Sequence, residues 1–250
     1  MTRQNARASR TRRSTRLPGW LLPSVIGVLA ATLIVASFVL SGDGTDSAQP
    51  EEHAPDQPGP TEVQQPESDL TVFETRSEAD IFAVGPVDAD VAMVVFSDFQ
   101  CPYCARWHQD TLPTMMQYVD EGKLRIEFRD LAIFGDESEY AVQAIFAAAQ
   151  QDALMEYQHA LFPNGETRQE SDLSFEALIA LAGELGLDEQ QFASDLESET
   201  ARDVVDEHGA FAASLGVYST PAFIIGGEPV LGAQPTDVFV DAVEQALQAA

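Results

Sequence analysis

Two cysteines separated by two residues are the side chains whose spacing most clearly suggests chemistry. They are the only cysteines in the 250 residues and stand in the run Cys101-Pro102-Tyr103-Cys104. Because this run follows a predicted strand, we expect it to open a helix. Free backbone N–H groups at a helix start stabilise a thiolate and lower the pKa of the first cysteine. We therefore predict that Cys101 is the nucleophile of thiol–disulfide exchange and that Cys104, nearly one turn deeper, is the resolving thiol.

Other uses of the cysteine pair fit the sequence less well. A zinc site needs two more ligands, and the four histidines are scattered singly along the chain. A static disulfide closing so short a loop would restrain the unfolded chain little. Pro102, by contrast, suits the first position of a helix, where its missing N–H costs no hydrogen bond. The pattern favours a redox pair that uses no other cofactor and no metal.

Two neighbours of the pair are secondary candidates. Asp98, three residues before Cys101, would either cap the helix start or tune the thiols electrostatically. His108 follows Cys104 by four residues, so it lies on the same helix face and would perturb the thiols when charged. The structural alternative for His108 is a packed or surface histidine.

The elements around the motif form a predicted β-α-β unit. Residues 92–96 are an apolar run typical of a buried strand, and residues 123–128 alternate like a half-buried strand. Between them we predict one helix over residues 101–121, kinked at Pro113.

The remainder of the chain is predicted to be a helical layer and a closing hairpin. Residues 138–215 are rich in Ala, Leu, Glu and Gln, with breaks at 163–165 and 183–186. Strands follow at 222–225 and 229–231. A last amphipathic helix has an apolar stripe at Phe239, Ala242, Val243, Ala246 and Leu247.

The charge is strongly negative and excludes one large class of partner. Thirteen Lys and Arg stand against 41 Asp and Glu, which gives a net charge of -28. Most of such a surface repels nucleic acid. The acid excess is also consistent with adaptation to high salt, where self-repulsion is screened.

The N-terminal third is predicted to attach the protein to a membrane. Residues 1–19 are basic, and residues 20–41 form an apolar stretch about 30 Å long as a helix, enough to span a bilayer. The arginines place residues 1–19 in the cytoplasm and everything after Ser41 outside it. A cleaved signal peptide ending near Ser41 is the alternative. Residues 42–69, with five prolines and eight acids, read as a disordered linker.

The residues around the cysteines resemble those of the DsbA-like thiol:disulfide oxidoreductases. The resemblance covers the run from Val84 through Cys104, the segment 157–162, the loop 216–223 and the run 232–235. It implies an α/β thioredoxin-like fold over residues 70–250, with an inserted helical domain at about 136–215.

The resemblance also implies further site residues. Pro102 and Tyr103 would support the active site from between the cysteines. The Thr220-Pro221 bond would be cis and lie beside Cys101, and the Thr220 backbone would pair with an extended substrate polypeptide. An ordinary proline at a strand start is the alternative for Pro221.

The implied activity is the formation or exchange of disulfides in exported proteins. The implied partners are unfolded or thiol-containing exported chains and a membrane redox protein that resets the cysteine pair. The best-known members of the family have His where this chain has Tyr103. A hydrogen-bond donor or positive charge near the thiolate makes the disulfide more oxidising, so its absence here leaves the direction of electron flow open. A thiol reductase serving haem or metal-centre maturation, and a non-catalytic metallochaperone of thioredoxin fold, are the alternatives.

Overall fold

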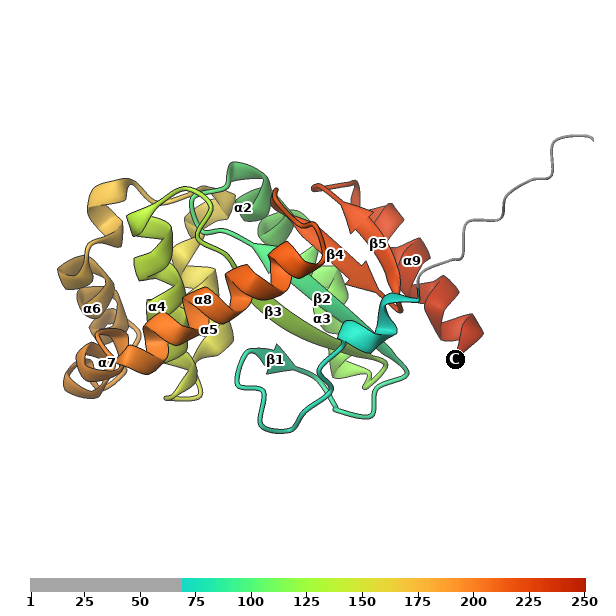
Figure 1. Cartoon of the computed structure of the whole chain (residues 1–250), viewed down its shortest axis with the longest axis horizontal. Helices are drawn as coiled ribbons and strands as arrows, with labels where there is room; N and C mark the ends of the chain where they lie inside the picture. The colour runs from blue at the N-terminus through green and yellow to red at the C-terminus, as the bar shows by residue number, and fades with distance from the viewer. Residues whose placement is uncertain (1–68) are drawn as a thin grey trace, which may run out of the picture. The chain divides into compact units, whose positions relative to one another are not determined.

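A central sheet of five strands, with helices on both faces, organises residues 69–250, which are the residues that the computed structural model describes (Figure 1). The strand order is β1-β3-β2-β4-β5. Central β2 (Val91–Ser97) runs parallel to β3 (Leu124–Asp130) and antiparallel to β4 (Ala222–Ile225). The edge strands β1 (Ala83–Val84) and β5 (Glu228–Leu231) are antiparallel to their neighbours. The predicted α/β class is confirmed.

The prediction that β3 is half-buried is wrong. All seven of its residues are buried, including the charged side chains of Arg125, Glu127 and Arg129. The period-two alternation does separate two faces, because Leu124 and Phe128 lie in the main core. The charged face is covered as well, by the edge segment, residues 74–82, which supplies hydrogen-bond partners for the charges.

Glu127 is the centre of this buried charge network. Its carboxylate accepts the backbone N–H groups of Thr75 and Arg76, at 2.8 and 2.7 Å. It also pairs with Arg125 at 2.9 Å and with Arg129 at 3.3 Å. The edge segment therefore closes this side of the sheet by hydrogen bonds and ion pairs. It follows the short 3-10 helix η1 (Leu70–Phe73).

The single kinked helix predicted after the cysteines is in fact two helices. They are α2 (Pro102–Asp110) and α3 (Leu112–Asp120), separated at Thr111. Pro113 stands in the first turn of α3, where a proline is well accommodated because no N–H is needed. The proline therefore marks a helix start instead of a kink.

A helical insertion joins β3 to β4 and forms the part of Figure 1 farthest from α9. Its break at residues 163–165 occurs where predicted, with Asn164 at a φ of 56°. The chain turns again at Gly186, after α6. The elements of the insertion are α4 (Asp136–Ala149), α5 (Leu154–Leu161), η2 (Pro163–Gly165), η3 (Glu170–Leu173), α6 (Phe175–Glu184), α7 (Glu189–Leu196) and α8 (Glu199–Ser214).

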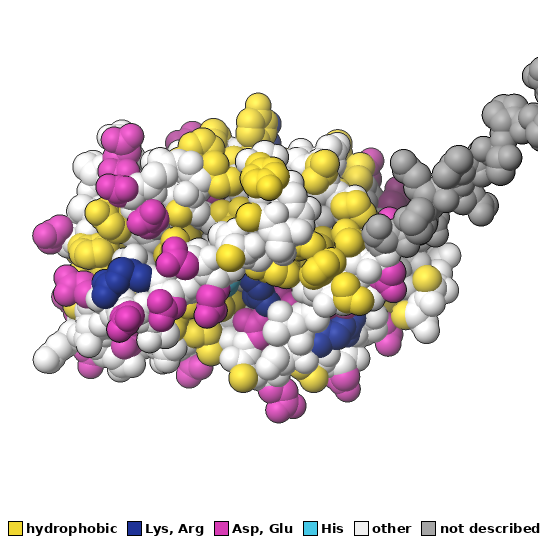
Figure 2. Space-filling model, viewed as in Figure 1, with side chains coloured by type: hydrophobic (Ala, Val, Ile, Leu, Met, Phe, Trp, Pro, Cys, Tyr) yellow, Lys and Arg dark blue, Asp and Glu magenta, His cyan; other side chains and the backbone are white. Residues whose placement is uncertain are grey.

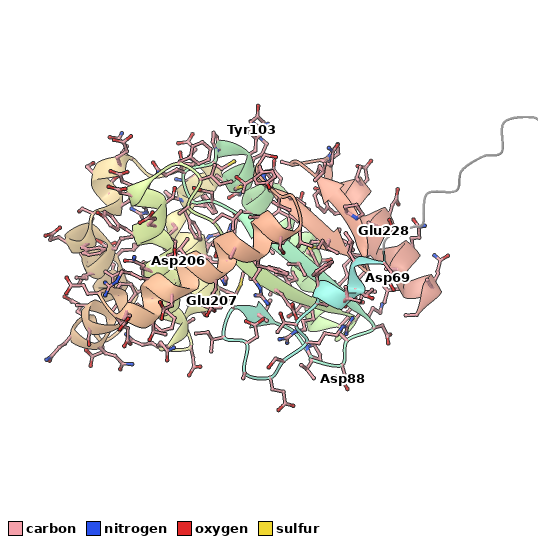
Figure 3. All side chains as sticks on the ribbon, viewed as in Figure 1. Asp69, Asp88, Tyr103, Asp206, Glu207 and Glu228 are labelled. Atoms are coloured by element: carbon pink, nitrogen blue, oxygen red, sulfur yellow. The ribbon has the colours of Figure 1, made fainter. Side chains whose placement is uncertain are left out.

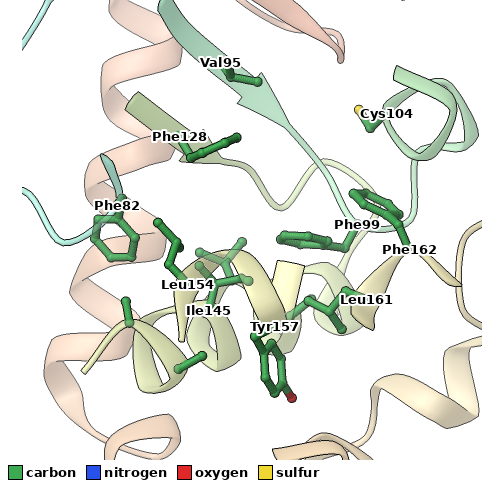
Figure 4. Packing of buried hydrophobic residues seen from close by; sticks show 14 of the residues in the cluster. Phe82, Val95, Phe99, Cys104, Phe128, Ile145, Leu154, Tyr157, Leu161 and Phe162 are labelled. Atoms are coloured by element: carbon green, nitrogen blue, oxygen red, sulfur yellow. The ribbon is translucent and has the colours of Figure 1, made fainter. Parts of the chain in front are cut away.

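The main core continues from the sheet into the insertion without a break (Figure 4). Val95 and Phe128 face Phe99 and Phe162 beside Cys104, and α4 and α5 pack below them. At the other end, Phe239 of α9 (Thr236–Ala249) contacts Trp107 and Phe223. The predicted stripe of α9 is thereby confirmed, with Phe239 and Val243 fully buried and its other three members packed against the core. This main core, which also contains Cys104 and Trp107 of α2, holds that redox helix in place.

The membrane predictions fall outside the described residues. These are the cytoplasmic segment 1–19, the spanning helix 20–41 and all of the linker before residue 69. Within residues 69–250, none of the helices combines the length and the apolar composition that crossing a bilayer requires.

Candidate active site

The cysteine pair lies where β2 ends and α2 begins. Cys101 is the residue just before the helix, with extended backbone angles, and Pro102 is its first residue. Cys104 lies one turn along, and its N–H donates to the Cys101 carbonyl at 3.0 Å. Both thiols are free and buried, 2% and 1% exposed, whereas Tyr103 between them projects outward (Figure 3). The geometry matches the predicted strand-to-helix position.

The surroundings of Cys101 favour its thiolate. Its pKa is lowered from 9.0 to about 6, mainly by a hydrogen bond from the Cys104 thiol. Burial opposes this shift, while the Thr220 hydroxyl and the N–H groups of Tyr103 and Cys104 support it. A thiolate with such a pKa is largely formed at neutral pH and is the better nucleophile of the two.

The surroundings of Cys104 favour the thiol instead. Burial raises the pKa of Cys104, and so does its hydrogen bond to Cys101. The Ser97 hydroxyl and the Asp98 backbone N–H partly oppose this shift. Sequence reasoning missed Ser97, although the alternation of β2 places residue 97 on the same sheet face as core residues Met93 and Val95.

The Thr220-Pro221 loop comes beside Cys101 from a distant part of the chain. The bond is cis, and the Thr220 carbonyl accepts the Cys101 thiol at 3.4 Å. Antiparallel pairing explains the meeting, since Ala222 at the start of β4 faces Phe96 near the end of β2. The backbone predicted to receive a substrate therefore lies against the nucleophile.

The Asp98 carboxylate accepts hydrogen bonds that hold neighbouring loops together. It is fully buried and accepts the N–H of Gln100 at 2.8 Å, the N–H of Ile133 at 2.7 Å and the hydroxyl of Ser138 at 2.7 Å. Burial raises its pKa, against these hydrogen bonds. The carboxylate thus ties the active-site loop to the segment after β3, and it accepts none of the first N–H groups of α2.

His108 faces the helical insertion. Its ring packs 5.6 Å from that of His159 and 5.3 Å from that of Phe162, measured between centroids. Burial lowers its pKa to about 4, and His159 acts in the same direction. It is therefore neutral at pH 7 and brings no positive charge to the thiols.

A second buried carboxyl, Asp130, was not anticipated from the sequence. It ends β3 in register with Ser97, on the sheet face that carries Phe128. Burial and the charge of Asp98 raise its pKa to about 8, while Arg129 opposes the shift. The sequence signal that could have identified Asp130 is its position as an acidic residue at the end of a strand with alternating polarity.

An apolar rim surrounds the thiols. The ends of β2, β3 and β5 and the start of β4 meet at the same edge of the sheet, and large apolar side chains stand exposed in and beside the connecting loops. On the face shown in Figure 2, apolar side chains gather around α2 and the nearby ends of β4 and β5, whereas acids are spread over the insertion. The rim residues are Tyr103, Ile133, Phe134, Tyr218 and Leu231.

Known proteins are similar to this chain in both sequence and fold. A thioredoxin family model, Thioredoxin_4, matches residues 77–245. A Bacillus cereus relative named "Probable disulfide bond formation protein D" is 27% identical over 150 residues, which are 58% of this chain and 69% of the relative. The crystal structure of oxidised BdbD from Bacillus subtilis has a TM-score of 0.60 and 21% identity, over 67% of this chain and 92% of BdbD.

A further relative is a much larger protein. The chain is 33% identical over 148 residues, 59% of its length, to the Na(+)/H(+) antiporter NhaA of Herminiimonas arsenicoxydans, of which the match covers 22%. The family match spans more than half of the chain and includes both cysteines. The chain therefore belongs to the thioredoxin family and is a DsbA-like thiol:disulfide oxidoreductase.

Proposed function

We propose that the chain forms or exchanges disulfides in exported proteins through Cys101 and Cys104. The observation that carries the proposal is the contrast between the two thiols. The pKa of Cys101 is lowered to about 6, whereas that of Cys104 is raised by burial. Such a pair has one good nucleophile and leaving group and one protected resolving thiol. The Bacillus cereus relative is itself named for disulfide bond formation.

The exchange proceeds through a mixed disulfide. A substrate thiolate attacks the Cys101 sulfur of the oxidised pair, and Cys104 leaves as a thiolate that takes up a proton. A second substrate thiolate then attacks the substrate sulfur of the mixed disulfide, and Cys101 leaves as a stabilised thiolate. Two electrons pass from the substrate to the enzyme. In the reductive direction, the Cys101 thiolate attacks a substrate disulfide and Cys104 resolves it.

The substrates that fit the site are extended polypeptides with accessible cysteines. The apolar rim suits unfolded chains, whose apolar side chains are exposed. The Thr220 backbone would add the substrate as a short strand beside Cys101, with Pro102, Tyr103 and Pro221 shaping the contact. A membrane redox protein would reset the pair after each turnover.

The proposed location follows from the N-terminal sequence. A single-pass anchor at residues 20–41 would leave residues 1–19 in the cytoplasm and the catalytic domain outside it. Cleavage near Ser41 would instead release the domain. The intact masses of the protein in the membrane fraction and in the released fraction distinguish these two forms, because cleavage removes about 40 residues.

The reduction potential of the full chain, equilibrated with glutathione buffers, tests the direction of electron flow. A value near that of DsbA, about -120 mV, supports a disulfide donor. A value near that of thioredoxin, about -270 mV, supports the alternative reductase. Absence of any exchange, with metal retained on the thiols, would contradict both and favour the metallochaperone.

A further inference from the structure

A cavity of about 520 Å³ lies beside the redox helix, between the α2–α3 pair and α5. Most of its lining is apolar, and neither cysteine contributes to it. Four side chains able to bind a soft metal ion line it together. They are His108 of α2, Met116 of α3, and Met155 and His159 of α5.

His108 is the side chain that needs an explanation. It is only 7% exposed, and its Nε2 atom has no hydrogen-bond partner among the described residues. A buried polar atom without a hydrogen-bond partner destabilises the folded protein. The neutral imidazole carries a lone pair on one ring nitrogen, which is what a metal ion requires.

The two imidazoles are spaced for one ion. Their ring centroids are 5.6 Å apart. Metal–nitrogen bonds of about 2.0–2.1 Å hold two rings at roughly this separation when they bind the same ion at an open angle. On α5, Met155 and His159 are four residues apart and therefore lie on the same helix face.

The ligand types select a soft, monovalent ion. The cavity lining includes one carboxylate, Glu156 of α5, but no group of three or more His, Cys, Asp or Glu side chains within residues 69–250 is placed to hold a metal, which leaves a hard divalent ion without a sufficient donor set. Imidazole and thioether ligands together suit Cu(I). A single positive charge also costs less than a double charge to place among apolar side chains.

We propose that His108, His159, Met116 and Met155 bind one Cu(I) ion, at a site separate from the thiol pair. The methionines line the same cavity and have flexible side chains with three rotatable bonds, which lets their sulfur atoms turn toward the ion. The negative charge of the chain attracts the cation. The site does not depend on thiol exchange.

The test uses the full chain with Cys101→Ser and Cys104→Ser, because free thiolates would themselves bind copper. Cu(I) is titrated without oxygen against a chromogenic Cu(I) chelator. We expect one Cu(I) per chain, and copper X-ray absorption should show sulfur ligands that no cysteine can supply. His108→Phe, or Met116→Leu with Met155→Leu, should weaken binding at least tenfold.

Met115→Leu is the matched control, since Met115 is on the same helix as Met116 but lies buried in the core and does not line the cavity. It should leave Cu(I) binding unchanged. The methionine pair keeps the test valid if His108→Phe misfolds, because Met-to-Leu changes conserve volume. Failure of the serine variant to bind Cu(I), equal binding in the methionine variants, or equal affinity for Zn(II) would overturn the proposal.

Discussion

Cys101 concentrates the chemistry in one side chain, and its environment makes its reactivity depend on pH. Its pKa of about 6 predicts that alkylation by iodoacetamide rises as the pH increases through about 6 and levels off above it. Cys104 should stay unmodified in the folded protein, because burial raises its pKa and keeps it in the unreactive thiol form. Mass spectrometry of the reduced protein after short labelling times measures both.

Cys104→Ala provides the control for this prediction. The hydrogen bond from Cys104 is the largest contribution to the lowered pKa of Cys101. Its removal should move the alkylation midpoint to higher pH. An unchanged midpoint would mean that the helix N–H groups and Thr220 alone lower the pKa of Cys101.

Asp130 predicts a pH dependence of stability that is independent of the thiols. Its pKa is raised from 3.8 to about 8, so the folded state holds a proton that the unfolded state has released. The associated stability is fully present below about pH 4 and is lost as the pH rises through about 8. Asp130→Asn mimics the protonated form, and its melting temperature should fall less than that of the wild type between pH 5 and 9.

Asp206→Asn is the matched control for Asp130, because Asp206 is exposed on α8. Its melting curve should follow that of the wild type at every pH. If Asp130→Asn shows the same pH slope as the wild type, Asp130 is ionised in the folded protein.

The edge segment and β3 depend on each other through Glu127. Replacing Glu127 with Gln leaves the buried Arg125 guanidinium without its carboxylate, and breaking a buried pair costs about 3–5 kcal/mol. Arg129, by contrast, keeps its ion pair with Asp80 at 2.6 Å. The released segment should also be cut by trypsin at Arg76, whose N–H donates to Glu127. Urea unfolding and limited proteolysis measure the two effects.

The exposed pair formed by Lys123 and Glu121 is the comparison for Glu127. Its atoms are 2.7 Å apart, like those of a strong ion pair, but both side chains are about half exposed. Glu121→Gln should therefore change the free energy of unfolding by less than about 1 kcal/mol. Equal effects of the two substitutions would contradict the role given to burial.

Much of the fold and of the reacting pair could be predicted from local patterns. The buried strand at residues 92–96, the cysteines after it and the stripe on α9 each carry their signal within a few residues. The burial of both faces of β3 could not be predicted, because it depends on the edge segment packing back against the strand. The meeting of His108 with His159 likewise depends on how the insertion docks against α2.

The charge of the molecule as a whole predicts a response to salt. A net charge of -28 destabilises the compact state by self-repulsion, and salt screens this repulsion over about 10 Å at 0.1 M and about 3 Å at 1 M. The melting temperature of the full chain should therefore rise from low to molar KCl. Equal melting temperatures across this range would contradict an adaptation to high salt.

The pairing of Leu70 with the turn between β4 and β5 also fixes where the cysteine pair lies relative to residue 69, the first described residue. The Leu70 N–H donates to the Gly227 carbonyl at 3.2 Å, at the edge of the sheet opposite the thiols. Figure 3 shows Asp69 beside Glu228 and far from Tyr103. The polypeptide thus enters the domain at the side opposite the thiols. A chain held at residue 69 would therefore leave the cysteine pair facing away from the point of attachment and accessible to substrate cysteines.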